Sequence, residues 1–242
     1  MRGRADDRRK RISGRSSLHG RLLLIAGLLV VLGAREPPAL ARPEPGWTLV
    51  TTEDGIEVTA REVPGRGFPT FRGVGVIYSD IYQVLAVMAD TRRHCEWMDR
   101  CAAAKQLRKI SEREYIVYSR TDVPWPIADR DAVFHSVALV DVKRRNVEIR
   151  FTAVTHPSMP PVDGVVRMTD LRGHYKMQAL AIDRTRVEFQ VDADPKGLLP
   201  KWLAKMATRR LPLYTIRDMR KQVNKTRGWY AERIKRWMAG KY

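Results

Sequence analysis

The residues that could support acid–base or metal chemistry in this 242-residue chain are few and scattered. Beyond residue 41 the sequence contains four histidines without the spacing of metal ligands: His94, His135, His156 and His174. Cys95 follows His94 directly, but neighbouring side chains diverge, so the two do not form a nucleophile and its base. Each histidine is therefore interpreted as an isolated strand or loop residue.

Two carboxylates stand closer together, at Asp129 and Asp131. Such a pair can act as general acid and base, but Arg130 between them favours a structural ion pair at the start of a strand. The chain also lacks the motifs of serine hydrolases, zinc proteases, P-loop proteins and dinucleotide-binding proteins. The sequence therefore predicts a protein that is not an enzyme and holds neither metal nor cofactor.

Residues 1–41 have the pattern of a signal peptide. A basic, polar stretch precedes an apolar run of 13 residues from Leu22 to Ala34, which is short for a membrane span. Ala39-Leu40-Ala41 offers a small-residue cleavage site. We expect cleavage and export from a bacterial cytoplasm to the periplasm or envelope; an uncleaved anchor is the alternative.

Positive charge is concentrated at the C-terminus. The formal net charge is +18; residues 42–195 hold 22 basic and 22 acidic residues, whereas residues 196–242 hold 14 and 2. Only the C-terminal segment therefore offers a cationic surface for phosphates of lipid or nucleic acid. Export and the neutral body argue against nucleic acid, so the predicted partner is an anionic membrane surface.

Cys95 and Cys101 are candidates for a disulfide, which an oxidising compartment would permit. Residues six apart point to different faces of one helix, so a helix must end between them if they pair. Two half-buried thiols are the alternative.

The hydrophobic period alternates between two and 3.6 along residues 47–223. Three strands are predicted first, then a helix capped by Asp80, and then a series of strands. A helix follows over 198–223, with Pro212 inside it. This order predicts an α+β fold in which a long helix packs on an antiparallel sheet.

Six stretches resemble the START family of lipid-transfer domains, related to the steroidogenic acute regulatory protein. They run in the family's order: W47TLVTTEDGIEVTARE, FPTFRGVGVI (68–77), DTRRHCEWM (90–98), PWPIADRDAVF (124–134), THPSMPPVDGVVRM (155–168) and DADPKGLLPKWL (192–203). The resemblance divides the chain into a signal peptide (1–41), a START-like domain (42–223) and a basic amphipathic extension (224–242).

The resemblance implies a helix-grip fold, in which a curved antiparallel sheet wraps the C-terminal helix and encloses a hydrophobic cavity. Alternation alone does not distinguish a cavity wall from a solid core, but the resemblance favours a cavity. The expected cavity residues come from the strands and from the helix: Phe134, Ser136, Phe151, Tyr175, Met177, Phe189, Val191, Trp202, Met206, Leu213 and Ile216.

The resemblance also places a gate loop at the cavity mouth, formed by Pro124, Trp125, Pro126, Ile127, Arg130 and Asp131. Trp125 and Ile127 are expected to cap the mouth or to dip into a bilayer interface. The charged residues would hold the loop against the sheet; a rigid hairpin whose Trp packs on the core is the alternative. Sterol-binding members carry a buried arginine where this chain has Ser136, so the ligand class stays open.

The C-terminal extension repeats aromatic and basic residues at helical spacing, which is typical of a membrane-surface helix. Its expected membrane contacts are Lys225, Arg227, Trp229, Arg233, Lys235, Arg236 and Trp237. The alternative is a tail whose aromatic residues pack back on the domain.

Taken together, the sequence predicts a monomer that binds one hydrophobic, lipid-like molecule and carries or presents it at the cell envelope. A cyclase or aromatase on a related helix-grip fold is the enzymatic alternative.

Overall fold

The structure is a computed structural model that describes residues 44–197 and 199–241. Within this part, ten strands form one sheet in the order β1-β2-β3-β10-β9-β7-β6-β5-β4, with β8 beside β6. All paired strands are antiparallel except β6 and β8. The strands are β1 (Thr48–Glu53), β2 (Ile56–Arg61), β3 (Thr70–Ile77), β4 (Cys101–Ser111), β5 (Glu114–Thr121), β6 (Asp129–Asp141), β7 (Asn146–Ala153), β8 (Val165–Arg167), β9 (Leu171–Ala181) and β10 (Arg184–Ala193).

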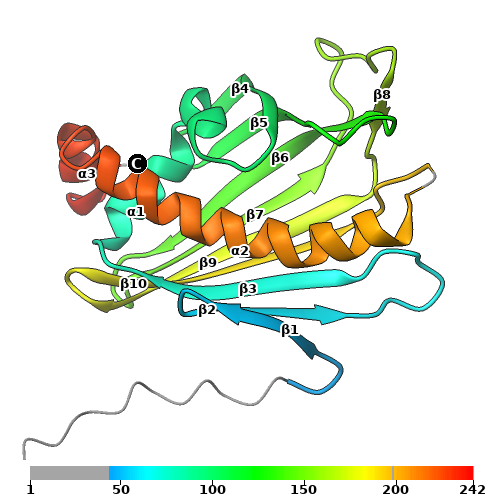
Figure 1. The fold of residues 1–242 in the computed structure, drawn as a ribbon. Coiled ribbons are helices and arrows are strands. Elements are labelled where there is room, and N and C mark those ends of the chain that lie inside the picture. The colour runs from blue at the N-terminus through cyan, green and yellow to red at the C-terminus, as the bar shows by residue number, and fades with distance from the viewer. Residues whose placement is uncertain (1–43, 198, 242) are drawn as a thin grey trace, which may run out of the picture. The chain divides into compact units, whose positions relative to one another are not determined.

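The sheet is curved and does not close, because β1 and β4 stand at its two ends. Helix α2 (Lys201–Lys225) lies along the inner face, as Figure 1 shows. The shorter helices α1 (Ile81–Ala89), η1 (Thr91–Glu96) and α3 (Ala231–Met238) gather near the C-terminal end of α2. The predicted α+β, helix-grip architecture is therefore confirmed.

Helix α2 comes unusually close to β3. A Cβ atom built on Gly73 would lie 2.8 Å from the Cβ of Pro212, so only glycine permits this approach. Pro212 stays inside a helix of 25 residues and is buried at this contact. Farther along, Ile216 packs with Ile56 and Val58 of β2. One side of α2 is therefore committed to β2 and β3, and the other side is left for the cavity.

Helix α1 begins as its sequence predicts. The Asp80 side chain accepts a hydrogen bond from the Tyr82 backbone N–H at 2.8 Å, which satisfies a free donor of the first turn. Its other carboxylate oxygen accepts a hydrogen bond from Arg145 at 2.7 Å. The cap thus also ties the helix to the turn between β6 and β7.

The described residues, 44–197 and 199–241, form one compact unit, which includes the C-terminal extension. Helix α3 packs against α1, and the Tyr230 hydroxyl donates a hydrogen bond to Asp90 at 2.9 Å. The predicted signal peptide, residues 1–41, lies outside the described residues.

Candidate ligand-binding site

An inner cavity of about 200 Å³ lies between the sheet and α2. Its wall carries a row of aromatic side chains from four neighbouring strands: Phe134, Phe151, Tyr175 and Phe189. Successive rings lie 5.8, 5.9 and 4.6 Å apart, and Tyr175 stacks on Phe189. The strand register explains the row, because Tyr175 is directly opposite Phe189 and every second residue faces inward.

Glycine also shapes this wall. A Cβ atom on Gly173 would lie 2.5 Å from the Phe151 ring and 2.3 Å from the Gln190 carbonyl oxygen. Phe151 is paired with Gly173 across β7 and β9, so its ring lies over the space that a side chain would fill. The aromatic row therefore depends on the absence of a side chain at this position.

An outer cavity of about 220 Å³ lies along the N-terminal half of α2, next to the predicted gate loop. Its lining is largely apolar and includes Phe68, Phe71, Leu171, Val191, Leu203 and Met206. The inner and outer cavities share four lining residues, namely Asp99, Thr121, Phe189 and Leu211. The two cavities are therefore adjacent along α2.

An ion pair stands at their boundary. Arg210 of α2 donates two hydrogen bonds to Asp99, from Nε to Oδ2 at 2.7 Å and from Nη2 to Oδ1 at 3.0 Å. The pairing raises the pKa of Arg210 above its ordinary value. The Arg210 guanidinium also lies 4.5 Å from the centre of the Tyr214 ring. This pair links the turn before β4 to α2 where the cavities meet.

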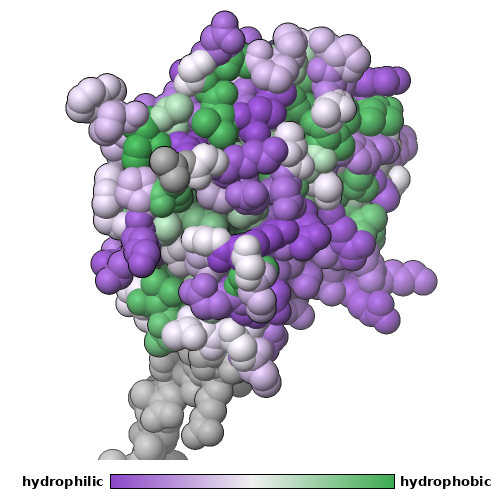
Figure 2. Space-filling view, turned by 90° about the vertical axis from the view of Figure 1, so that its right-hand side faces the viewer, coloured by the Kyte–Doolittle hydropathy of each residue, from purple (hydrophilic) through white to green (hydrophobic). Residues whose placement is uncertain are grey.

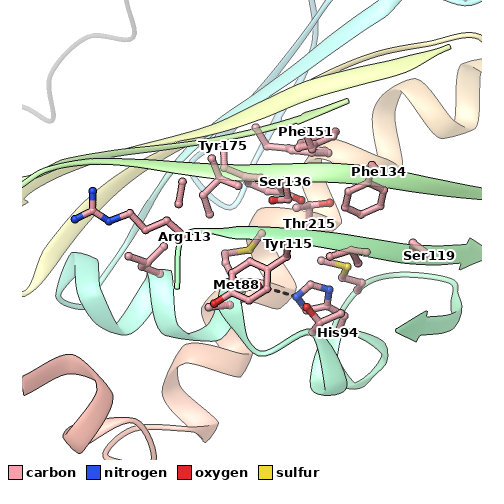
Figure 3. A pocket seen from close by; sticks show the side chains of 18 of the residues that line it. Met88, His94, Arg113, Tyr115, Ser119, Phe134, Ser136, Phe151, Tyr175 and Thr215 are labelled. Carbon is pink, nitrogen blue, oxygen red and sulfur yellow. Dashed lines mark hydrogen bonds between the residues drawn. The ribbon is translucent and has the colours of Figure 1, made fainter. Parts of the chain in front are cut away.

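The inner cavity carries more polar groups than the sequence suggested. Beyond Tyr175 and Ser136, it is lined by His94, Asp99, Glu112, Arg113, Tyr115, Ser119, Thr121 and Thr215. Figure 3 shows Ser136 of β6 and Thr215 of α2 among the lining side chains, with Tyr115 and His94 below them. His94 belongs to the short helix η1 and Asp99 to the turn before β4, and no hydrophobic period predicts how side chains in such short segments point. Thr215 lies on the cavity-facing side of α2, which is not the side that the sequence predicts.

Burial sets the protonation of two of these groups. Desolvation lowers the pKa of His94, outweighing its hydrogen bond to Met88 and the nearby Asp90. The neutral ring donates from Nε2 to the Met88 carbonyl at 2.9 Å, because a carbonyl can only accept. Burial raises the pKa of the Tyr175 hydroxyl well above its usual range. Both side chains are therefore uncharged at neutral pH.

The predicted cavity residues divide into two groups. Those that line a cavity are Phe134, Ser136, Phe151, Tyr175, Phe189, Val191 and Met206. Those that the structure places elsewhere are Met177, Trp202, Leu213 and Ile216. Leu213 and Ile216 pack on β2 instead, since the cavity-facing side of α2 carries Leu203, Arg210, Leu211 and Thr215.

The other two have their own reasons. Met177 is on the inner face of β9 but lies in the solid core that also contains α1. Trp202 is 57% exposed in the first turn of α2. The helical pattern predicts that the Trp202 side chain points into the cavity, but in the structure the neighbouring Leu203 lines the outer cavity instead.

The predicted gate loop adjoins the outer cavity. Pro124 and Arg130 line it, Trp125 is 93% exposed, Pro126 is exposed and Ile127 is half-buried. The Trp125 ring therefore does not pack on the core. Trp125 projects away from the protein surface next to the cavity.

Asp129 and the two charged residues of the gate loop, Arg130 and Asp131, each have a separate partner. Asp129 accepts hydrogen bonds from Arg120 and from the Val123 backbone. Arg130 is buried and donates to the carbonyl oxygens of Ala128, Pro195 and Lys196, joining the loop to the segment before α2. Asp131 is fully buried and accepts two hydrogen bonds from Arg167, at 2.7 and 2.9 Å.

The C-terminal residues point in two directions. Trp237 is 2% exposed and lines the inner cavity, so it faces the domain and not a membrane. The side of α3 that carries Trp237 is the apolar one, and Trp237 belongs to the same hydrophobic core as the residues of α1. The outward residues are Arg227, Trp229, Lys235 and Arg236, with Arg233 half-buried. Lys225 is exposed as well but pairs with Glu96 at 2.9 Å.

The structure joins Cys95 and Cys101 by a disulfide. The 3-10 helix η1 ends between them, at Glu96, as pairing requires. Cys101, Met98 and Asp99 line the inner cavity, so the disulfide braces part of its wall. In the described residues, no three His, Cys, Asp or Glu side chains gather as a metal site would require.

A curved antiparallel sheet that grips a long C-terminal helix, with cavities between the two, defines the helix-grip class of proteins. Within that class the chain belongs to the START domain family, which residues 39–227 match. A protein of unknown role from Pseudomonas aeruginosa is 31% identical over 179 residues, covering 74% of this chain and 87% of that protein. The mouse phosphatidylcholine transfer protein is 24% identical, covering 76% of this chain and 86% of its own.

Solved structures agree with this assignment. A STAR-related lipid transfer protein from Xanthomonas axonopodis is 28% identical and superposes with a TM-score of 0.66, covering 74% of this chain and 99% of that one. Human STARD10, 21% identical, shares the fold with a TM-score of 0.69, covering 79% of this chain and 78% of that one. No helix in the described part of the chain is both long and apolar enough to cross a membrane.

Proposed function

We propose that this protein binds a single hydrophobic, lipid-like molecule across the inner and outer cavities and carries or presents it at the cell envelope. The observation that carries the proposal is the adjacency of two cavities between the sheet and α2. Ligand pockets commonly measure about 300 Å³ or more. Neither cavity of about 200 or 220 Å³ reaches this size alone, but the two together do.

The names of the relatives support a lipid as the ligand. The proteins from mouse and from Xanthomonas axonopodis are named as transfer proteins for phosphatidylcholine and for lipid. This chain can also stabilise a bound lipid, because burial of apolar surface contributes roughly 25 cal/mol per Å². The aromatic row and the apolar outer cavity supply that surface.

We place the mouth at the gate loop. Trp125 projects beside the outer cavity, and Trp202 is exposed in the first turn of α2, where the neighbouring Leu203 lines the same cavity. Figure 2 shows that this end of the molecule has hydrophobic residues interspersed with many hydrophilic ones. Exposed indoles suit the interfacial region of a bilayer. The outward basic residues of the C-terminal segment are a second candidate contact with anionic lipid.

Location at the envelope is supported by the signal-peptide pattern of residues 1–41. A carrier that is not an enzyme is proposed because both carboxylates of the inner cavity are held in ion pairs and its histidine is uncharged. His94 donates to Met88, Asp99 pairs with Arg210, and Glu112 pairs with Lys109. A cyclase-type enzyme would need a carboxylate or another general acid or base free to exchange a proton with its substrate.

The test is native mass spectrometry of the protein purified from a bacterial envelope, followed by organic extraction. A single co-purifying lipid of defined mass, bound one to one, is the expected result. If the protein is empty and takes up neither sterols, fatty acids nor phospholipids from liposomes, the carrier function is wrong.

A further inference from the structure

The inner cavity is lined by three hydroxyl groups without protein partners, on two buried residues and on the half-buried Ser136. Tyr175 is 7% exposed and Thr215 is 8% exposed, and both line the cavity together with Ser136. Within the described residues, no hydrogen bond joins any of these three hydroxyls to another protein group. Buried hydroxyls normally have a partner, because an unsatisfied one costs free energy. These groups are therefore available to a ligand.

The three hydroxyls come from both sides of the cavity. Ser136 belongs to β6 and faces inward beside Phe151, its partner across the sheet. Tyr175 belongs to β9 and stacks on Phe189, which fixes its ring. Thr215 reaches the cavity from α2, opposite the sheet (Figure 3). His94 contributes an acceptor, since its Nε2 is engaged with Met88 and its Nδ1 carries a lone pair.

The charged groups of the same cavity are compensated or turned elsewhere. Asp99 is neutralised by Arg210, and Glu112 by Lys109. Arg113 stands at one end of the cavity and directs its guanidinium away from Ser136 and Thr215 (Figure 3). A carboxylate or phosphate placed among the hydroxyls would lose its hydration without gaining a cation, which is unfavourable.

We infer that the inner cavity selects lipids whose buried polar end is an uncharged hydroxyl, carbonyl or ester, held by Tyr175, Ser136 and Thr215. This inference rests on the proposed lipid-binding function and adds a ligand class to it. The apolar remainder of the ligand extends past Asp99 into the outer cavity, where Phe71, Leu171 and Val191 line the wall. The ligand is thus bound with its polar end innermost.

The experiment compares three chains of equal length that differ only at the polar end: 1-octadecanol, octadecane and stearate. Each is tritiated and supplied in sucrose-loaded phosphatidylcholine vesicles at pH 7.4. After the vesicles are pelleted, the label that stays with the protein is counted. We expect octadecanol to be bound at least fivefold more than octadecane or stearate.

Two substitutions remove hydroxyls and keep shape. Tyr175→Phe retains the ring that stacks on Phe189, and Thr215→Val retains the branched side chain. Together they should lower octadecanol binding about tenfold and leave octadecane binding unchanged. Tyr78→Phe is the matched control, because Tyr78 is exposed on the surface and lines neither cavity. Circular dichroism and thermal unfolding verify that each variant is folded.

The outcomes separate this inference from the proposed function. Equal binding of octadecanol and octadecane, or preferred binding of stearate, overturns the selection of an uncharged polar end and leaves a lipid carrier. Loss of octadecane binding in the double variant likewise overturns it, because a hydrocarbon cannot use a hydroxyl. Failure of octadecanol to bind wild-type protein also overturns the inference, whereas the carrier function itself fails only if native mass spectrometry and liposome uptake find no lipid of any class.

Discussion

Asp99 and Arg210 meet through two hydrogen bonds, at 2.7 and 3.0 Å, where the inner and outer cavities adjoin. A lipid that occupies both cavities has to pass this ion pair. The pair therefore separates the inner cavity from the outer one, and it also links α2 to the turn before β4.

The first prediction concerns this ion pair. Asp99→Asn weakens the charge-assisted bonds, which are roughly twice as strong as neutral ones. We expect lipid exchange to become several-fold faster, with a stability loss of about 1 kcal/mol, since Arg210 is partly exposed. Stopped-flow transfer of a fluorescent lipid between vesicles measures the rate. Glu53→Gln removes the same charge from the surface pair of Glu53 with Arg209 and should leave exchange unchanged.

The second prediction concerns the gate loop. Trp125→Ala removes a side chain that is 93% exposed, so the melting temperature should change by little. Transfer from vesicles should slow at least fivefold, because the indole no longer contacts the bilayer interface. Ile182→Ala is the control, since Ile182 is 77% exposed in the turn between β9 and β10, away from the mouth. A large loss of stability with unchanged transfer would contradict the gate.

The third prediction concerns Asp131 and Arg167. Asp131 is fully buried, so Asp131→Ala leaves the Arg167 guanidinium without its counterion. Breaking a buried pair in this way typically costs about 3–5 kcal/mol. Urea unfolding should show a loss of this size, whereas Asp141→Ala, which breaks an exposed pair with Arg144, should cost under about 1 kcal/mol. Similar losses in both variants would show that the buried pair contributes little.

The fourth prediction concerns acid stability. The hydrogen bond from His174, with help from Lys176 and Arg186, lowers the pKa of Glu188 from 4.5 to about 2. The unfolded chain therefore binds more protons between these values, so the stabilisation is complete above pH 4.5 and is lost as the pH falls toward 2.

The free energy of unfolding of the wild-type protein should fall by about 1–2 kcal/mol more than that of Glu188→Gln as the pH falls from 4.5 toward 2, after allowance for solvent screening. Urea midpoints measured from pH 2 to 6 for both proteins give the difference. Parallel curves for wild type and variant would show that Glu188 has no depressed pKa.

The fifth prediction concerns Gly173. Gly173→Ala places a methyl group 2.5 Å from the Phe151 ring and 2.3 Å from the Gln190 carbonyl oxygen, so β9, β10 or Phe151 must shift. We expect a loss of about 1–3 kcal/mol and weaker lipid binding, as overpacking distorts the cavity wall. Gly67→Ala is the control, because a Cβ there meets nothing within 4 Å. Unchanged binding and stability would mean that the wall yields easily.

The sheet was more predictable than the helix that it grips. Alternation placed Phe134, Phe151 and Tyr175 on one face correctly, because a strand has only two faces. A helix has a continuous range of directions, and the apolar side of α2 is split between β2 and the cavity. Leu213 and Ile216 were therefore assigned to the wrong part of it.

The same difficulty affects the C-terminal segment. Its basic and aromatic pattern fits a membrane-surface helix as well as a helix docked on a neighbour. Only the position of α1 distinguishes the two for Trp237, which is buried. The spacing of Tyr230 and Trp237 between exposed basic residues is consistent with docking on the domain. The sequence does not show which surface receives them, because α1 is distant in the sequence.

The unclosed sheet has a consequence for solubility. Its terminal strands β1 and β4 present backbone groups to which another chain could add a strand, the first step of aggregation. Strand β4 carries Lys105, Arg108 and Lys109, and its pairing with β5 shifts register at three places; β1 has one such shift. Charge and irregular geometry both discourage strand addition. The open sheet thus has both of its edges protected against self-association.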